Sequence, residues 1–223
     1  GVLRYSIVTS GKRLTDEEVD QVCESIRKIK EETNIEVCFS FGLLKEEQLR
    51  KVREAGATRA HCNLETSRRY FPEICTTHTY DQKIETLKAA VAAGLSICSG
   101  GIMGLGETLE DRVDMVLTVK ELGVKSVPVN FLNPIPGTPY EDNKPLTDEE
   151  ARQCVAVFRF IIPDASIRLA GGRGLLDDKG KECFQSGANA AISGDMLTTA
   201  GITVQKDMEM LKDLGYKPQL WED

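Results

Sequence analysis

The sequence lacks any long apolar run, and it begins with neither an initiator methionine nor the charged-then-apolar pattern of a signal peptide. No run approaches the roughly 18 residues that a membrane span requires. An excess of positive charge is also missing, since 28 basic residues stand against 35 acidic residues for a net charge of −7. Nucleic-acid phosphates attract basic surfaces. We therefore expect a cytoplasmic protein that binds neither membranes nor nucleic acid and whose amino terminus is truncated.

Closely spaced cysteine pairs are absent as well, although the chain contains seven cysteines. Without a CxxC pair a zinc finger has little support, and irregular spacing does not match the dense framework of a small secreted disulfide domain. No Ser-His-Asp order and no Walker loop are found, which argues against hydrolases and kinases. A reducing compartment is expected.

Short apolar runs alternate with stretches of helical periodicity, a pattern typical of βα units around a parallel sheet. The expected strands are Tyr5–Thr9, Ile35–Phe41, Arg59–Leu64, Ser96–Met103, Ser126–Leu132, Ser166–Ala170 and Ala190–Ser193. The expected helices are Thr15–Glu32, Lys45–Ala55, Asp81–Ala93, Thr108–Leu122, Thr147–Ile161 and Val204–Leu214. These elements predict an α/β fold in a single domain over residues 1–223, a (β/α)8 TIM-type barrel without its first βα unit. An open doubly wound sheet is the alternative.

Four cysteines follow expected strands: Cys38, Cys62 and Cys98 at strand ends, and Cys75 a few residues later. One such thiol is usually a small buried hydrophobic group, but four near one edge of a parallel sheet suggest ligands for a soft metal or an iron–sulfur cluster. The remaining cysteines fall within helical patterns, and we interpret them as core or surface residues: Cys23, Cys154 and Cys183.

A glycine-rich loop follows the fourth expected strand, and it includes Gly101 and Gly104. Glycines let backbone amides approach a ligand closely, although they also make ordinary turns, and the order GxGxxG of dinucleotide sites is not present. Beside the thiols, the loop suggests contact with the nucleoside or amino-acid portion of a cofactor. On its own this signal is weak.

Several polar residues also stand at strand ends. Asn63 and Asn130 can each cap a turn, or together bind an amide or urea group, and Glu65 can accept hydrogen bonds from ribose hydroxyls. Arg168 lies within an apolar strand, where a guanidinium needs a partner or a cavity. The two histidines, His61 and His78, are most simply explained by local hydrogen bonds.

Five sequence blocks resemble the biotin synthase family of radical S-adenosylmethionine enzymes. They cover residues 63–80, 98–108, 127–139, 167–173 and 186–201, which begin NLETS, CSGGI, VPVNF, IRLAG and SGANA. The resemblance implies a (β/α)8 radical barrel that inserts sulfur into dethiobiotin. It further implies two clusters. A 4Fe-4S cluster on a CxxxCxxC loop cleaves S-adenosylmethionine, and an auxiliary cluster, 2Fe-2S or larger, donates the sulfur.

The resemblance also implies roles for individual residues and partners. Dethiobiotin is the expected substrate, a reduced flavodoxin or ferredoxin the expected electron donor, and a homodimer the expected assembly. Roles are implied as follows: Cys38, Cys98 and Arg168 as catalytic ligands of the auxiliary cluster, Asn63 and Asn130 for dethiobiotin, and Glu65, Gly101 and Gly104 for S-adenosylmethionine.

This sequence departs from the family pattern in three ways. CxxxCxxC is absent from its 223 residues, so we expect that segment to precede this chain. Ser6 stands where a third cysteine ligand is usual, and Cys62 and Cys75 replace a histidine and an aliphatic residue. A lost ligand and two gained thiols suggest an auxiliary cluster held by Cys38, Cys98 and Cys75, with Cys62 as the less certain fourth ligand.

Two other functions are compatible with part of the pattern. Another radical S-adenosylmethionine barrel, of the thiazole or hydrogenase-cofactor maturase type, would share the glycine loop but would not require Asn63, Asn130 and Arg168 together. A barrel that binds a cluster without radical chemistry would share the thiols alone. Release of deoxyadenosine on addition of dethiobiotin distinguishes these alternatives.

Overall fold

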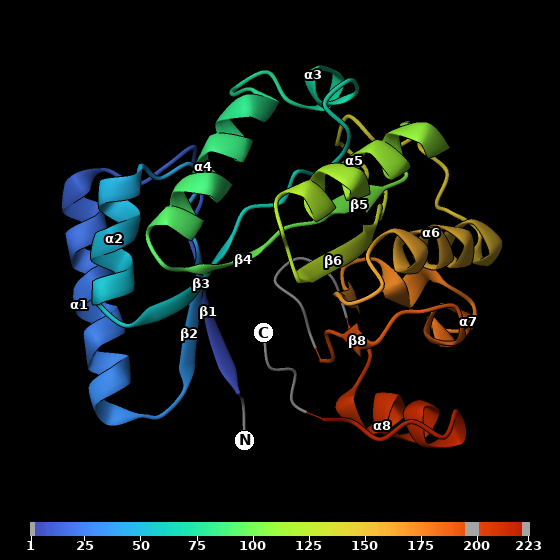
Figure 1. Ribbon diagram of the computed structural model, residues 1–223. Coiled ribbons are helices and arrows are strands. Elements are labelled where there is room, and N and C mark those ends of the chain that lie inside the picture. Colours follow the sequence, from blue (N-terminus) through green and yellow to red (C-terminus); the bar gives the residue numbers. More distant parts are fainter. Residues whose placement is uncertain (1–2, 195–200, 220–223) are drawn as a thin grey trace. The chain divides into compact units, whose positions relative to one another are not determined.

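The computed structural model describes residues 3–194 and 201–219, which fall into two compact units. Unit 1 comprises Gly1–Leu64 and Phe71–Ser99, and unit 2 comprises Glu65–Tyr70 and Gly100–Asp223 (Figure 1). Residues 195–200 belong to the block 186–201 that carries part of the family resemblance, and they lie outside the described residues. No helix in the described part of the chain is long and apolar enough to cross a membrane.

Unit 1 is a parallel sheet whose strands follow one another in chain order and alternate with helices. The strands are β1 (Arg4–Val8), β2 (Glu36–Ser40), β3 (Ala57–His61) and β4 (Ser96–Cys98). The helices are α1 (Asp16–Glu32), α2 (Glu46–Glu54), α3 (Phe71–Ile74) and α4 (Tyr80–Ala92). This is the βα alternation expected from the apolar pattern.

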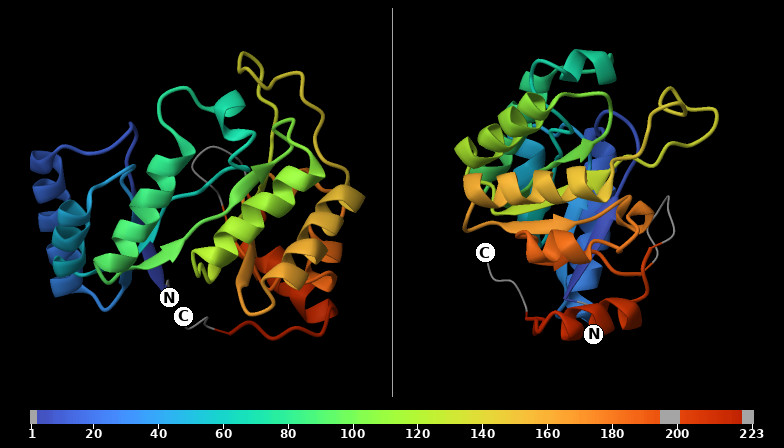
Figure 2. Two further views of the ribbon diagram at one scale, coloured as in Figure 1. Left: turned by 45° about the horizontal axis from the view of Figure 1, so that its top comes forward. Right: turned by 90° about the vertical axis from the view of Figure 1, so that its right-hand side faces the viewer.

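Unit 2 repeats this organisation with shorter strands. Its parallel strands are β5 (Gly101–Met103), β6 (Ser126–Phe131), β7 (Ser166–Leu169) and β8 (Ala190–Ala191). Its helices are α5 (Leu109–Glu121), α6 (Asp148–Ile161), the 3₁₀ turn η1 (Arg173–Leu175), α7 (Lys181–Gln185) and α8 (Val204–Asp213). Helices α5 and α6 lie side by side along these strands (Figure 2).

Threonines begin most of the long helices. In each case the threonine hydroxyl accepts a hydrogen bond from the backbone N–H of the residue three positions later, and the side chain of that residue accepts one from the threonine N–H. The four threonines are Thr15, Thr79, Thr108 and Thr147. Each such capping box satisfies two of the backbone donors that a helix start leaves without partners. The chain therefore leaves each strand-to-helix loop at a defined residue, which fixes the loops that carry the candidate site.

Strand register gives each sheet one polar and one apolar face, because paired residues of parallel strands point to the same side. In unit 1 the apolar face includes Val37 and Phe39, which are buried, as are Val19, Ile26 and Leu49 of the covering helices. The opposite face carries thiol and polar residues: Ser6, Cys38, Arg59, His61, Ser96 and Cys98. In unit 2 the corresponding face carries Ile102, Ser126, Asn130, Ser166 and Arg168.

The expected elements are confirmed with small differences at their ends, and one of them is wrong. The run Ser96–Met103 is two strands: β4 (Ser96–Cys98), which pairs with β3, and β5 (Gly101–Met103), which pairs with β6. At the break, an added Cβ on Gly100 would lie 2.0 Å from the Pro128 carbonyl oxygen. The short elements α3 and η1 were not expected, since segments of three or four residues carry no readable periodicity, whereas α7 contains Cys183, which was expected in a helical pattern.

Candidate functional site

Cys38 and Cys98 lie on the polar face of unit 1, one on each side of the strand that carries His61. His61 is paired with Cys98 in the register of β3 and β4, and its imidazole hydrogen-bonds both thiols. Cys38 is 4% exposed and Cys98 is fully buried. The structure thus brings together two of the predicted cluster ligands, around a histidine for which the sequence predicted only local hydrogen bonds.

Charge separation is favoured among these three side chains. Burial alone would lower the pKa of His61, but the hydrogen bonds to Cys38 and Cys98 outweigh it and raise that pKa to about 9. Burial would raise the pKa of the Cys38 thiol, yet the hydrogen bonds from His61 and Ser6 lower it. Iron binds the thiolate form of cysteine, so this environment prepares Cys38 as a ligand.

Ser6 occupies the place where the family resemblance implies a third thiol. It is paired with Cys38 in the register of β1 and β2, and its hydroxyl hydrogen-bonds the Cys38 sulfur. Arg59, on the same face, is 2% exposed and donates from Nε to Ser96 Oγ at 3.1 Å. The face therefore combines two thiols with hydrogen-bond donors that stabilise negative charge.

Cys75 and Cys62 are placed differently from this pair. Cys75 follows α3, and its sulfur lies 3.4 Å from His78 Nδ1 and 3.6 Å from Thr77 Oγ1. Cys62 follows β3, is half-buried, and donates its backbone N–H to the Cys98 carbonyl oxygen at 3.1 Å. Across residues 3–194 and 201–219, no three His, Cys, Asp or Glu side chains are grouped so as to hold a single ion.

Arg168 and Asn130 lie on the polar face of unit 2. Arg168 donates from Nη1 to Ser126 Oγ at 3.0 Å. The Asn130 amide donates to the Gly101 carbonyl oxygen at 3.1 Å and accepts from the Gly171 N–H at 2.9 Å. An amide can make four hydrogen bonds, so Asn130 joins two strand ends and retains one N–H and one lone pair. Asn63 belongs to unit 1, where its carbonyl oxygen accepts from Lys83 Nζ at 2.8 Å.

Glu65 is held against the glycine loop by its backbone. Its N–H donates to the Gly100 carbonyl oxygen at 3.1 Å, and its own carbonyl oxygen accepts from the Ile102 N–H at 2.9 Å. A Cβ added to Gly101 would lie 2.4 Å from that Glu65 oxygen. Glu65 has a φ of 70°, a left-handed conformation that is costly for a residue other than glycine. Such strain persists only where neighbouring contacts enforce it.

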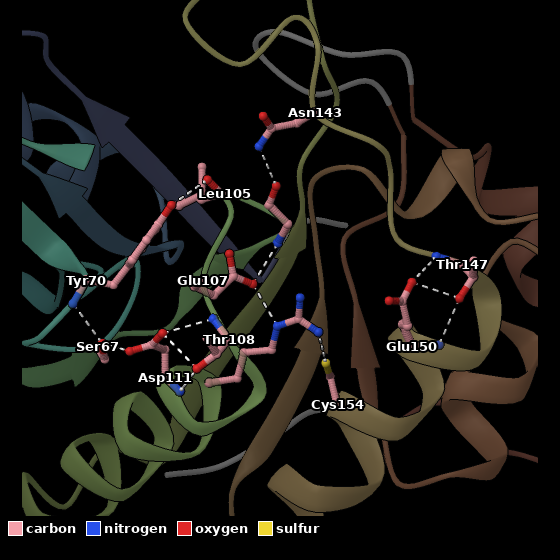
Figure 3. A network of polar contacts seen from close by, with 12 residues as sticks. Ser67, Tyr70, Leu105, Glu107, Thr108, Asp111, Asn143, Thr147, Glu150 and Cys154 are labelled. Carbon is pink, nitrogen blue, oxygen red and sulfur yellow. Dashed lines mark hydrogen bonds and ion pairs between the residues drawn. The ribbon is translucent and has the colours of Figure 1, made fainter. Parts of the chain in front are cut away.

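The rest of the glycine loop is supported by buried polar side chains (Figure 3). The Gly104 N–H donates to Glu107 Oε1 at 2.8 Å, and Asn143 Nδ2 donates to the Gly104 carbonyl oxygen at 2.9 Å. Arg112 holds Glu107 at 2.7 Å and reaches Cys154 Sγ at 3.3 Å. The glycines therefore serve the close packing of the protein's own backbone, and Glu107 anchors the loop.

The residues present fit the two kinds of group that the sequence suggests. An iron–sulfur cluster needs thiolates on a protected face, and Cys38 and Cys98 meet that requirement with Arg59 and His61 beside them. A nucleoside portion needs a hydrogen-bond acceptor for its hydroxyls, which the half-buried Glu65 can supply beside the glycine loop.

Sequence reasoning missed Arg59, Glu107 and Asp111, and it missed the place of His61 between the two thiols. For Arg59 and His61 the signal was their spacing of two within one strand, which predicts a shared face. For Asp111 the signal was its position three residues after Thr108, the spacing of a capping box. Glu107 became visible only once its contact with the Gly104 N–H was known.

Family models match both parts of the chain. Residues 1–119 match the Radical SAM superfamily, and residues 128–217 match the Biotin and Thiamin Synthesis associated domain. The biotin synthase of Akkermansia muciniphila is 59% identical over 220 residues, which are 99% of this chain and 68% of that protein. Biotin synthase 2 of Corynebacterium diphtheriae is 61% identical over 216 residues, covering 97% of this chain and 66% of that protein. The chain spans about two thirds of the length of these relatives.

Solved structures show the same fold at low sequence identity. Methylornithine synthase superposes with a TM-score of 0.81 at 19% identity, covering 98% of this chain and 69% of that one. The FeFe-hydrogenase maturase of Carboxydothermus hydrogenoformans gives 0.81 at 16% identity, covering 99% and 56%. These likenesses confirm the barrel-type α/β fold over the open doubly wound alternative.

Proposed function

The chain belongs to the biotin synthase family of radical S-adenosylmethionine enzymes, and on this basis we propose that it inserts sulfur into dethiobiotin to form biotin. One observation carries the proposal. Identity of 59% extends over 99% of the chain, and within it two buried thiols share one polar face. Identity to a hydrogenase maturase is 16%, so that alternative is supported by the fold alone.

Bound S-adenosylmethionine and its cluster supply hydrogen-atom abstraction at two carbons of dethiobiotin, and the auxiliary cluster supplies the sulfur that closes the ring. The residues of this chain bind and orient these groups. Cys38 and Cys98 hold the auxiliary cluster on the polar face of unit 1, with Arg168 as a further ligand. Asn63 and Asn130 bind the ureido group through paired donors and acceptors. Glu65, Gly101 and Gly104 bind the adenosyl portion.

We further propose that Cys75 is a ligand of the auxiliary cluster and that Cys62 is the fourth. The Cys75 sulfur lies beside the side chains of His78 and Thr77. Burial would raise the pKa of the Cys75 thiol, but hydrogen bonds from the Thr77 hydroxyl and from the backbone of Thr77 and His78 lower it. The reductant is proposed to be a flavodoxin or ferredoxin, and the assembly a homodimer.

Cluster ligation is tested by the iron and sulfide content of the enzyme expressed from its complete gene. Cys38→Ala and Cys98→Ala are expected to lose the auxiliary cluster's share of iron and its visible absorbance. Cys23→Ala is the matched control, since Cys23 is equally buried but lies in α1. Cys75→Ala with unchanged iron and spectra would remove Cys75 from the ligand set.

Activity is tested by deoxyadenosine release under reducing, anaerobic conditions. Dethiobiotin is expected to stimulate release and to be converted to biotin. Asn130→Ala should weaken dethiobiotin binding. Release that ignores dethiobiotin, or no biotin from an enzyme with full cluster content, would refute the proposed function.

A further inference from the structure

The segment Glu65–Tyr70 is fastened to the start of α5 by one buried carboxylate. Asp111 is 1% exposed, and its Oδ1 accepts from Ser67 Oγ at 2.6 Å and from Arg69 Nε at 3.0 Å. Its Oδ2 accepts from the Thr108 N–H at 2.9 Å, from Thr108 Oγ1 at 3.0 Å, and from Arg69 Nη2. The Asp111 carboxylate therefore both caps helix α5 at Thr108 and binds Ser67 of the segment (Figure 3).

Tyr70 makes a second attachment, at the glycine loop itself. Its hydroxyl donates to the Leu105 carbonyl oxygen at 3.1 Å, and its N–H donates to Ser67 Oγ at 3.0 Å. Gly106 has a φ of +107°, and a Cβ added there would lie 2.5 Å from the Tyr70 hydroxyl. The hydroxyl thus reaches the loop only because residue 106 has no side chain.

These attachments enclose Glu65. At one end of the segment its strained backbone pairs with Gly100 and Ile102; at the other end Tyr70 holds the glycine loop and Arg69 holds Asp111 at the start of the helix that follows the loop. A left-handed φ at a glutamate persists when its surroundings over-determine it. The backbone of Glu65 is therefore joined to the loop directly, and the segment that carries it is attached a second time by the residues four and five positions later.

We propose that Tyr70 and Arg69 are positioning residues for S-adenosylmethionine, acting by holding Glu65 and the glycine loop in one arrangement. This inference rests on the proposed function, in which Glu65 and the loop bind the adenosyl portion. Without the Tyr70 hydroxyl, the Leu105 carbonyl oxygen loses this hydrogen bond, and the glycine loop can adopt other conformations. Only a fraction of these conformations can bind S-adenosylmethionine. Apparent affinity falls in proportion to the competent fraction.

The test is the dissociation constant of S-adenosylmethionine for the complete, cluster-loaded enzyme, measured by anaerobic calorimetry without reductant. Tyr70→Phe removes one hydroxyl, and a hydrogen bond of this kind corresponds to about a fivefold weakening. The KM for S-adenosylmethionine should rise by a similar factor while kcat at saturation stays within about twofold. The dissociation constant of dethiobiotin should not change.

Tyr216→Phe is the matched control. The Tyr216 hydroxyl also donates to a backbone carbonyl in unit 2, that of Phe184 at 3.2 Å, but away from the glycine loop in sequence. It should leave the affinity for S-adenosylmethionine unchanged. Arg69→Met is the second variant, since a side chain that is 64% exposed can be replaced without opening the core, and it should weaken binding in the same direction.

The outcomes separate this inference from the proposed function. Wild-type enzyme that fails to bind S-adenosylmethionine would overturn the function itself. Wild-type binding that Tyr70→Phe and Arg69→Met leave unchanged would overturn only the positioning role. Equal weakening by Tyr70→Phe and Tyr216→Phe would also overturn it, because general loss of stability would then account for the effect.

Discussion

Replacing Asp111 by asparagine should destabilise the protein by an amount that the hydrogen bonds of the carboxylate predict. The change keeps the shape of the side chain but removes its charge and turns one acceptor into a donor. Burial alone would raise the pKa of Asp111, yet the hydrogen bonds from Ser67, Thr108 and Arg69 lower it from 3.8 to about 2. The native state therefore favours the ionised form strongly.

The size of the destabilisation caused by Asp111→Asn follows from the pKa of Asp111. One pKa unit corresponds to about 1.4 kcal/mol, so the lowering to about 2 corresponds to roughly 2.5 kcal/mol. We expect Asp111→Asn to reduce the free energy of unfolding by about 2 to 3 kcal/mol at pH 7, since charge-assisted bonds are lost in a buried place. In a domain of this size that is a fall of about 5 to 10 °C in Tm.

The pH dependence has a definite sign. A carboxyl whose folded pKa lies below its unfolded pKa contributes stability that is complete above the unfolded value and is lost as pH falls through the folded value. The difference in free energy of unfolding between wild type and Asp111→Asn should therefore be constant from pH 7 to about 5 and be roughly halved at pH 3. Urea titrations monitored by circular dichroism at several pH values measure it.

Asp164→Asn is the control for this measurement. Asp164 is also paired, with Lys125, but its side chain is 68% exposed, and an exposed ion pair contributes little. It should change stability very little at any of these pH values. A loss below about 0.5 kcal/mol for Asp111→Asn, or a gap that stays constant down to pH 2.5, would refute the reasoning.

Two further predictions concern unit 2. Asp207→Ala should lower the free energy of unfolding by about 3 to 5 kcal/mol, because it leaves the charge of Arg173 buried without its partner. Arg173 is 1% exposed and donates to both Asp207 oxygens, at 2.8 and 2.7 Å. The double variant Arg173→Met, Asp207→Leu removes both charges and should recover most of that loss. Thermal unfolding checks this, and equal losses in both variants would contradict it. Gly101→Ala should cost about 1 to 3 kcal/mol, since its Cβ would meet Met115 Sδ at 2.3 Å and the Glu65 carbonyl oxygen at 2.4 Å. Gly137→Ala has open space around its Cβ but a φ of +81°, so its cost should come from backbone strain alone, about 1 kcal/mol. A loss at Gly101→Ala no larger than that would show that close packing at residue 101 is not limiting.

Helices and strands were predictable because their signals are local. The apolar period of each strand and the threonine before each of the α1, α4, α5 and α6 helices depend only on neighbouring residues, and the observed starts agree. The break at Ser99–Gly100 was not predictable in this way. It lies where a Cβ on Gly100 would meet the Pro128 carbonyl oxygen at 2.0 Å, a contact with a segment far along the chain that local periodicity does not reveal.

Residue types at the candidate site were also readable from the sequence, but their partners were not. Cys38 and Cys98 stood out as thiols at strand ends, whereas for His61 and His78 the sequence predicted only local hydrogen bonds. The register of β3 against β4 sets His61 beside Cys98, and hydrogen bonds to both thiols then raise its pKa to about 9. The proposed roles of Asn63, Asn130, Arg168, Cys62 and Cys75 stay predictions.

The sequence by itself determined the βα alternation, the starts of the helices, the family and the chemical types available for a cluster and a nucleoside. Only the tertiary structure decided that Cys38 and Cys98 share a face with His61, that Glu65 is strained against Gly101, and that Asp111 joins two segments. The physical reason is the range of the interactions. Periodicity and capping act over three or four residues, whereas register and burial bring together groups that are more than thirty residues apart in the chain.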